Sequence, residues 1–243
     1  MIAILKKELR VFFGSLIGYL VIGLFLVVIG LFMWVFTETS VLNYPYASLE
    51  QLFTIGPFLL MFLIPALTMR SFAEENQNGT LELLYAKPIG LNAIIIGKYL
   101  ACLLLLVFAL VPTFVYIYSL QNLTLYGASL DYGAIQGSYW GLFFCGASFV
   151  SIGIFSSSLV SNQIVAFLLG TFLCFFFYLG WDYLSGLPIF IGGLDLFIQK
   201  LGLDYHYNSL SKGILEFRSL FYFVSIVFGF LILAKRALIW NRQ

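Results

Sequence analysis

Charged residues are scarce in this sequence. Asp, Glu, Lys and Arg make up only 9% of its 243 residues, whereas a soluble domain carries about 25%. Hydrophobic residues account for 62% of the chain, and its mean hydropathy is +1.02. This composition excludes an ordinary soluble domain, and we expect residues 1–243 to form one integral membrane domain.

The residue types that build catalytic and metal centres are nearly absent. His206 is the one histidine and has no second ligand residue at metal spacing, so we expect a surface side chain. Cys102, Cys145 and Cys174 all fall within apolar runs, which favours small buried core residues. Ser148 lies in an apolar run with no general base in reach. We therefore expect no catalytic, cofactor-binding or metal-binding residue on this chain.

Energy-coupling sites are missing as well. The run 90–98 resembles a phosphate-binding loop, but Asn92 and Tyr99 stand where that loop needs Gly and Ser or Thr. No ionisable residue lies near the middle of any long apolar run, where ion-coupled transporters carry them. Lys98 is expected to snorkel at a membrane boundary. Any work done by this protein must then be powered by another polypeptide.

Long apolar runs dominate what is present. A membrane-spanning helix needs about 20 apolar residues. Six runs qualify or come close: residues 17–36, 52–69, 99–119, 139–158, 164–181 and 221–234. Six spans place both termini on the same side of the membrane.

Basic residues predict which side that is. With the N-terminus inside, nine of the twelve Lys and Arg residues lie on inner segments, and the outer segments 37–51 and 121–137 have none. Because cytoplasmic segments carry the excess of Lys and Arg, both termini and the polar segment 70–88 are predicted to be cytoplasmic.

Three further segments have helical patterns. Residues 1–15 alternate apolar and basic side chains, which fits an amphipathic helix in the headgroup region; a plain positively charged flank fits equally well. Residues 194–201 and 207–217 have apolar residues at helical spacing, which predicts two amphipathic helices on the outer leaflet. The small residues of 137–157 predict close helix packing within the chain, with a subunit interface as the alternative.

The polar segment 70–88 has its own start and stop signals. Ser71 and Glu74 form a capping-box pattern, and Asn78-Gly79 is typical of a helix end. Thr80 is placed to cap a second short helix that Pro88 would end. Helices this short are marginal alone because nucleation is costly. We therefore expect another surface to dock against them.

This segment resembles the first cytoplasmic loop of ABC-2-type transporter permeases. The similarity lies in Arg70, Ser71, Phe72, Ala73, Glu74, Glu75, the run 79–84, Pro88, Gly97 and Lys98. The resemblance implies an all-α integral membrane fold: a six-transmembrane-helix bundle with an amphipathic N-terminal helix, a cytoplasmic coupling helix, and outer helices between spans five and six.

The resemblance also implies partners and a contact site. An ABC ATPase subunit would bind the coupling helix, through Glu74, Glu75, Gly79, Thr80, Leu81, Glu82 and Leu84. A second permease, either another copy or a sister subunit, would complete the membrane core. Membrane lipids would surround it in the bacterial inner membrane, and no nucleic acid is involved. The alternative for the contact site is packing under its own bundle.

A narrower similarity concerns the segments 2–9, 17–20, 65–72 and 97–99, which look like gliding-motility permeases of Bacteroidota. It implies an exporter-type transporter associated with gliding. Two other functions stay open. One is a scaffold that keeps the permease fold without transport, and the other is a lipid-modifying enzyme, which is disfavoured because this sequence has no acid–base pair that reaches the membrane interface. The aromatic, nearly uncharged spans favour an amphiphilic or polymeric cargo.

Overall fold

The computed structural model describes residues 1–41, 48–85, 90–123, 130–189, 192–213 and 216–240. These residues form helices and contain no strands. Six of the helical stretches are long and apolar enough to cross a membrane, as the sequence predicted.

The six spans are built from single or consecutive helices. They are α2 (Leu16–Trp34); α3 (Glu50–Thr68) with α4 (Arg70–Gln77); α6 (Leu91–Leu110) with the 3₁₀ turn η2 (Val111–Thr113) and α7 (Phe114–Leu123); α8 (Tyr132–Leu159); α9 (Gln163–Phe175) with the π turn η3 (Phe176–Gly180) and α10 (Trp181–Ser185); and α13 (Phe217–Trp240). The 3₁₀ turn includes Pro112, which cannot donate a backbone hydrogen bond.

Helix α8 is the centre of the bundle. It packs against α3, α6, α9, α12 and α13. Its small residues allow this: a Cβ atom added to Gly153 would overlap Thr68 of α3, and one added to Gly146 would lie 2.6 Å from Leu106 Cδ2 of α6. The prediction that these small residues serve packing within the chain is confirmed at both positions.

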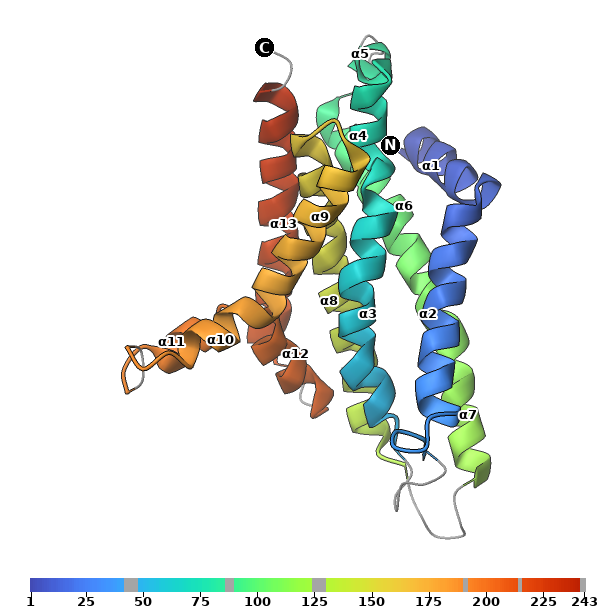
Figure 1. Cartoon of the computed structure of the whole chain (residues 1–243), viewed down its shortest axis with the longest axis vertical. Coiled ribbons are helices and arrows are strands. Elements are labelled where there is room, and N and C mark those ends of the chain that lie inside the picture. Colours follow the sequence, from blue (N-terminus) through green and yellow to red (C-terminus); the bar gives the residue numbers. More distant parts are fainter. Residues whose placement is uncertain (42–47, 86–89, 124–129, 190–191, 214–215, 241–243) are drawn as a thin grey trace.

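The N-terminus and the C-terminal end of α13 (Phe217–Trp240) lie at the same end of the bundle as α4 and α5 (Thr80–Tyr85), as Figure 1 shows. The N-terminal helix α1 (Ile2–Gly14) turns into α2 at Ser15, which has an extended backbone. Ile4, Glu8 and Phe12 form the buried stripe of α1, which packs against α6 and α2. The helical alternative for residues 1–15 is therefore the correct one.

The segment between spans five and six differs from the prediction. Helix α11 (Asp195–Gln199) has no buried residue, but α12 (Leu203–Ser211) is packed against α8, α13 and η3. The predicted helix over 207–217 is wrong in its bounds, because α12 ends at Ser211 and Phe217 already belongs to α13.

His206 of α12 is buried, so the prediction of a surface histidine is wrong. Its ring stacks on Tyr222 with centroids 4.1 Å apart, and its two nitrogens face Ser219 Oγ and the Lys200 carbonyl at 3.1 and 3.0 Å. Burial lowers the pKa of His206. The three cysteines are free and buried, as predicted.

Candidate functional site

The polar segment after α3 forms two short helices. Helix α4 ends at Gln77 with Asn78 as its C-cap, and Gly79 follows with φ +68°, the left-handed conformation that a side chain disfavours. The predicted helix stop at Asn78-Gly79 is confirmed. Thr80 is the first residue of α5, and its hydroxyl donates to the Glu75 carbonyl at 3.2 Å. Pro88 lies outside the described residues.

The beginning of α4 is capped from another helix. Ser157 Oγ of α8 accepts hydrogen bonds from the backbone N–H groups of Phe72 and Ala73 at 2.9 and 3.0 Å, and donates to the Met69 carbonyl at 3.0 Å. These are among the amide groups that a helix start leaves without an intrahelical partner. The predicted capping box is wrong, because no side chain caps α4 from its own sequence and Ser71 is the second residue of the helix. Ser157 instead fixes α4 to the core of the bundle.

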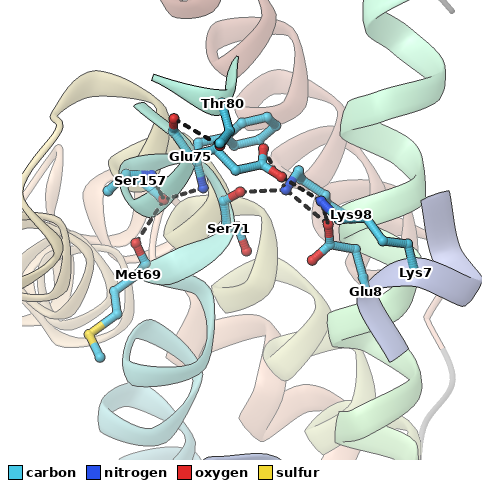
Figure 2. A network of polar contacts seen from close by, with 10 residues as sticks. Lys7, Glu8, Met69, Ser71, Glu75, Thr80, Lys98 and Ser157 are labelled. Atoms are coloured by element: carbon cyan, nitrogen blue, oxygen red, sulfur yellow. Dashed lines mark hydrogen bonds and ion pairs between the residues drawn. The ribbon is translucent and has the colours of Figure 1, made fainter. Parts of the chain in front are cut away.

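A buried lysine organises the charged side of the site. Figure 2 shows Lys98 of α6 between Glu8 of α1 and Glu75 of α4. Its Nζ atom lies 3.0 Å from Glu8 Oε1 and 2.9 Å from Glu75 Oε2, and it donates to the Ser71 carbonyl at 2.5 Å. The ammonium group also lies 4.9 Å from the centre of the Phe72 ring. The side chain is only 2% exposed, so the prediction that Lys98 snorkels is wrong.

Lys7 completes the network from the solvent side. Its Nζ atom lies 2.7 Å from Glu75 Oε1 and 3.4 Å from Glu8 Oε1, and the side chain is half exposed. Burial acts to lower the pKa of Lys7, but hydrogen bonding and the charges of the two glutamates outweigh it, so this pKa is raised. Two lysines and two glutamates therefore form a neutral group.

This network connects three elements that are distant in sequence: α1, α4 and α6. Removing one partner of a buried ion pair costs about 3–5 kcal/mol, because it leaves a charge without compensation. Together with the Ser157 hydrogen bonds, the network holds α4 against α1, α6 and α8. A displacement of α4 must then be passed on to these helices or break the contacts.

A cleft of about 400 Å³ lies beside the network, between α1 and α4. Its charged lining consists of Lys7, Glu8, Arg70, Glu74, Glu75 and Lys98. Arg70 pairs with Glu74 through two contacts of 2.7 and 3.0 Å. All six charges are thus paired within the chain.

The predicted contact residues divide into two groups. Glu75 and Leu81 are turned toward the bundle: the Glu75 side chain is 13% exposed and Leu81 is 8% exposed. Glu74 is partly exposed, and Gly79, Thr80 and Glu82 are exposed. Leu84 belongs to α5, but its side chain lies outside the described part of the structure.

The sequence did not reveal Lys7, Glu8, Lys98 and Ser157 as members of the site. One signal was available for Glu8, which takes the middle position of the stripe Ile4, Glu8, Phe12 on an otherwise apolar face. A charge at such a position requires a buried partner. Ser157 has no comparable signal, because serines at helix-packing positions are common.

The site is suited to mechanical connection. Across the described residues, no group of three or more His, Cys, Asp or Glu side chains is placed to hold a metal ion. Its chemistry consists of hydrogen bonds and ion pairs between helices, and its exposed end is a turn of backbone with acidic side chains.

Comparison with known proteins agrees with this picture. Residues 37–225 match a family model described as ABC-2 family transporter protein. No curated protein shows a significant match. The matched region contains the spans from α3 to α9, the α4–α5 segment and the beginning of α13.

Proposed function

Because this chain belongs to the ABC-2 family of transporter proteins and is therefore a permease membrane subunit, we propose that a separate ABC ATPase drives it through α4 and α5. The subunit itself is not catalytic, and ABC-2 permeases generally pair with ABC ATPase subunits. In the proposed complex the ATPase contacts the exposed end of α4–α5, through Glu74, Gly79, Thr80, Glu82 and Leu84. Glu75 and Leu81 support that end from inside.

One observation carries the proposal: α4–α5 is exposed at its tip and fixed at its base. Gly79, Thr80 and Glu82 are open to a partner, whereas Ser157 and Lys98 hold the start of α4 against α8 and α6. A loop that only packed under the bundle would not need an exposed acidic tip. A loop that only bound a partner would not need a buried ionic anchor.

The proposed assembly places this chain in the bacterial inner membrane with both termini and α4–α5 in the cytoplasm. The distribution of Lys and Arg supports that orientation. A second permease, either another copy or a sister subunit, completes the membrane core. The chain acts as one permease domain, is surrounded by membrane lipids and carries no cofactor of its own.

We further propose that the transporter is of the exporter type and is associated with gliding motility. The support is the similarity of the segments 2–9, 17–20, 65–72 and 97–99 to gliding-motility permeases. Deletion of the gene in its native bacterium should abolish gliding on agar while growth continues. Normal gliding in the deletion strain would remove this part of the proposal.

Co-purification with the cognate ATPase tests the coupling contact. Glu82→Arg reverses a charge at the exposed tip, and Gly79→Pro imposes a negative φ where the chain needs +68°. Both variants should insert in the membrane but lose the ATPase from the purified complex. Asp195→Arg, in the exposed helix α11 at a distance from α4–α5, is the matched control and should retain it. Retention of the ATPase by both tip variants would contradict the proposed contact.

A further inference from the structure

A second cavity opens near the opposite end of the bundle from α4–α5. It has a volume of about 500 Å³ and lies between the start of α3, the start of α8, α12 and the π turn η3. Three acidic residues line it, Glu50, Asp131 and Asp204, against one basic residue, Lys212. The lining therefore carries an excess of negative charge.

Asp204 is a partly buried carboxylate of this lining that no cation in the described residues neutralises. Asn208 Nδ2 donates to its Oδ2 at 2.8 Å, and the Tyr178 hydroxyl also interacts with it. Both donors are neutral, and Asp204 has no ion pair within 4.0 Å among the described residues. Asp131, in contrast, has a structural role, because its Oδ1 caps α8 by accepting from Ala134 N at 3.0 Å. Partial burial of a carboxylate costs folding free energy, and binding of a cation would offset that cost.

Aromatic rings form the apolar wall of the cavity. The rings of Phe58 and Tyr178 meet edge to face at 5.8 Å, and Tyr207 follows at 6.4 Å from Tyr178. Phe58 is 42% exposed, so part of its ring is open to a ligand. Tyr178 lies in the middle of the π turn, a distortion that is found frequently at functional sites.

The lining distinguishes between classes of ligand. A bare metal ion does not fit, because no group of acidic residues in the described part of the chain converges closely enough to hold one. An anion is disfavoured by the three carboxylates. A carboxylate beside aromatic rings is the combination that recognises an organic ammonium group, through ion pairing and cation–π attraction.

We propose that this cavity binds an organic ammonium group, with Asp204 as the charged contact and Phe58 and Tyr178 as the aromatic wall. The ligand class is an organic cation with an apolar portion, since ion pairing with Asp204 and attraction to the aromatic rings act on ammonium and aromatic cations alike. Ligand binding at this cavity needs no ATPase. The proposal for the cavity can therefore be tested independently of the coupling contact at α4–α5.

Binding of ethidium, a fluorescent aromatic cation, tests the proposal. The purified chain in phosphatidylcholine nanodiscs is titrated with ethidium, and fluorescence anisotropy is corrected with empty nanodiscs. Wild type should bind, and Asp204→Asn should raise the Kd about tenfold or more, as expected for loss of a charge-assisted contact. Asp195→Asn removes a carboxylate of α11 that does not line the cavity and should leave the Kd unchanged.

Phe58→Leu is the second variant and should also weaken ethidium binding. Because this ring is partly exposed, we expect the Phe58→Leu variant to fold. It therefore tests the cavity even if Asp204→Asn does not fold. Fluorescein, an aromatic anion of similar size, should not bind to the cavity. The proposal would be overturned if the folded cavity variants bound ethidium with an unchanged Kd. It would also be overturned if fluorescein bound as tightly as ethidium and Phe58→Leu weakened that binding.

Discussion

Lys98 and Glu8 form a 3.0 Å ion pair across ninety positions of sequence, and their side chains are only 2% and 8% exposed. The pair joins α6 to the N-terminal helix α1. Glu75 of α4 lies 2.9 Å from the same ammonium group. The N-terminal helix, the third span and the proposed coupling segment are therefore connected through a single side chain.

Lys98→Met should be strongly destabilising. It leaves the carboxylates of Glu8 and Glu75 without their buried counter-charge, which costs about 3–5 kcal/mol of unfolding free energy. Thermal unfolding of the purified chain in detergent measures the loss. Lys6→Met removes an exposed lysine of α1 and should have little effect.

A rescue variant separates charge from packing. Adding Glu8→Gln and Glu75→Gln to Lys98→Met removes the unpaired charges, and part of the lost stability should return. If the triple variant is no more stable than Lys98→Met alone, the role of the network is packing and the electrostatic explanation is wrong.

Ser157→Ala should loosen the start of α4. It removes the acceptor for the Phe72 and Ala73 amides, and leaving buried donors unsatisfied costs about 1–3 kcal/mol. Hydrogen exchange of these two amides should accelerate. Ser151→Ala is the matched control, since its hydroxyl bonds only within α8, to the Ser148 carbonyl. Equal exchange rates in the two variants would argue against capping by Ser157.

Gly79→Ala isolates the backbone requirement at the turn. A Cβ atom at this position meets nothing within 4 Å, so the cost is conformational and amounts to about 1–2 kcal/mol. Gly14→Ala is also free of contacts but lies in helix α1, where Ala is favoured. The melting temperature should fall in the first variant and hold or rise in the second. A fall of equal size in both would contradict the assignment.

The long apolar runs made the six spans predictable, because a hydrocarbon core accepts few other structures from a single chain. Gly79 was predictable for a similar local reason: Asn-Gly after a helical pattern indicates a left-handed end. Both predictions depend on neighbours in sequence. They needed no knowledge of which helices meet.

The features that escaped prediction all depend on which helices meet. Ser71 has a good local capping pattern, yet Ser157 caps α4 because α8 passes close to its first turn. Lys98 and His206 have sequence surroundings typical of boundary and surface residues, but α1, α4 and α13 bury them. Tertiary contacts determined these positions.

His206 gives the protein a specific dependence on pH. Burial lowers its pKa below the ordinary value, while the charges of Arg218 and Glu216 act in opposite directions. The unfolded chain therefore takes up a proton first, and stability is lost as pH falls through about 6.5, by at most about 1.4 kcal/mol per pH unit.

The variant His206→Gln measures that contribution. Between pH 7.5 and 5.5 wild type should lose more unfolding free energy than His206→Gln. The comparison is needed because Asp204 has the opposite effect. Burial raises the pKa of Asp204, so protonation of this residue on acidification increases the free energy of unfolding. Identical pH profiles for wild type and His206→Gln would contradict the assignment.

Site-specific cross-linking at Glu82 tests the central claim most directly. The native cysteines are buried, so Glu82→Cys places an accessible thiol at the exposed tip of α4–α5, and Lys212→Cys places one near the other end of the bundle. After co-expression with the cognate ABC ATPase, a thiol-reactive cross-linker should join the ATPase to Glu82→Cys. It should not join the ATPase to Lys212→Cys. Cross-linking at Lys212→Cys, or none at Glu82→Cys in an intact complex, would contradict the proposal that the ATPase acts through this segment.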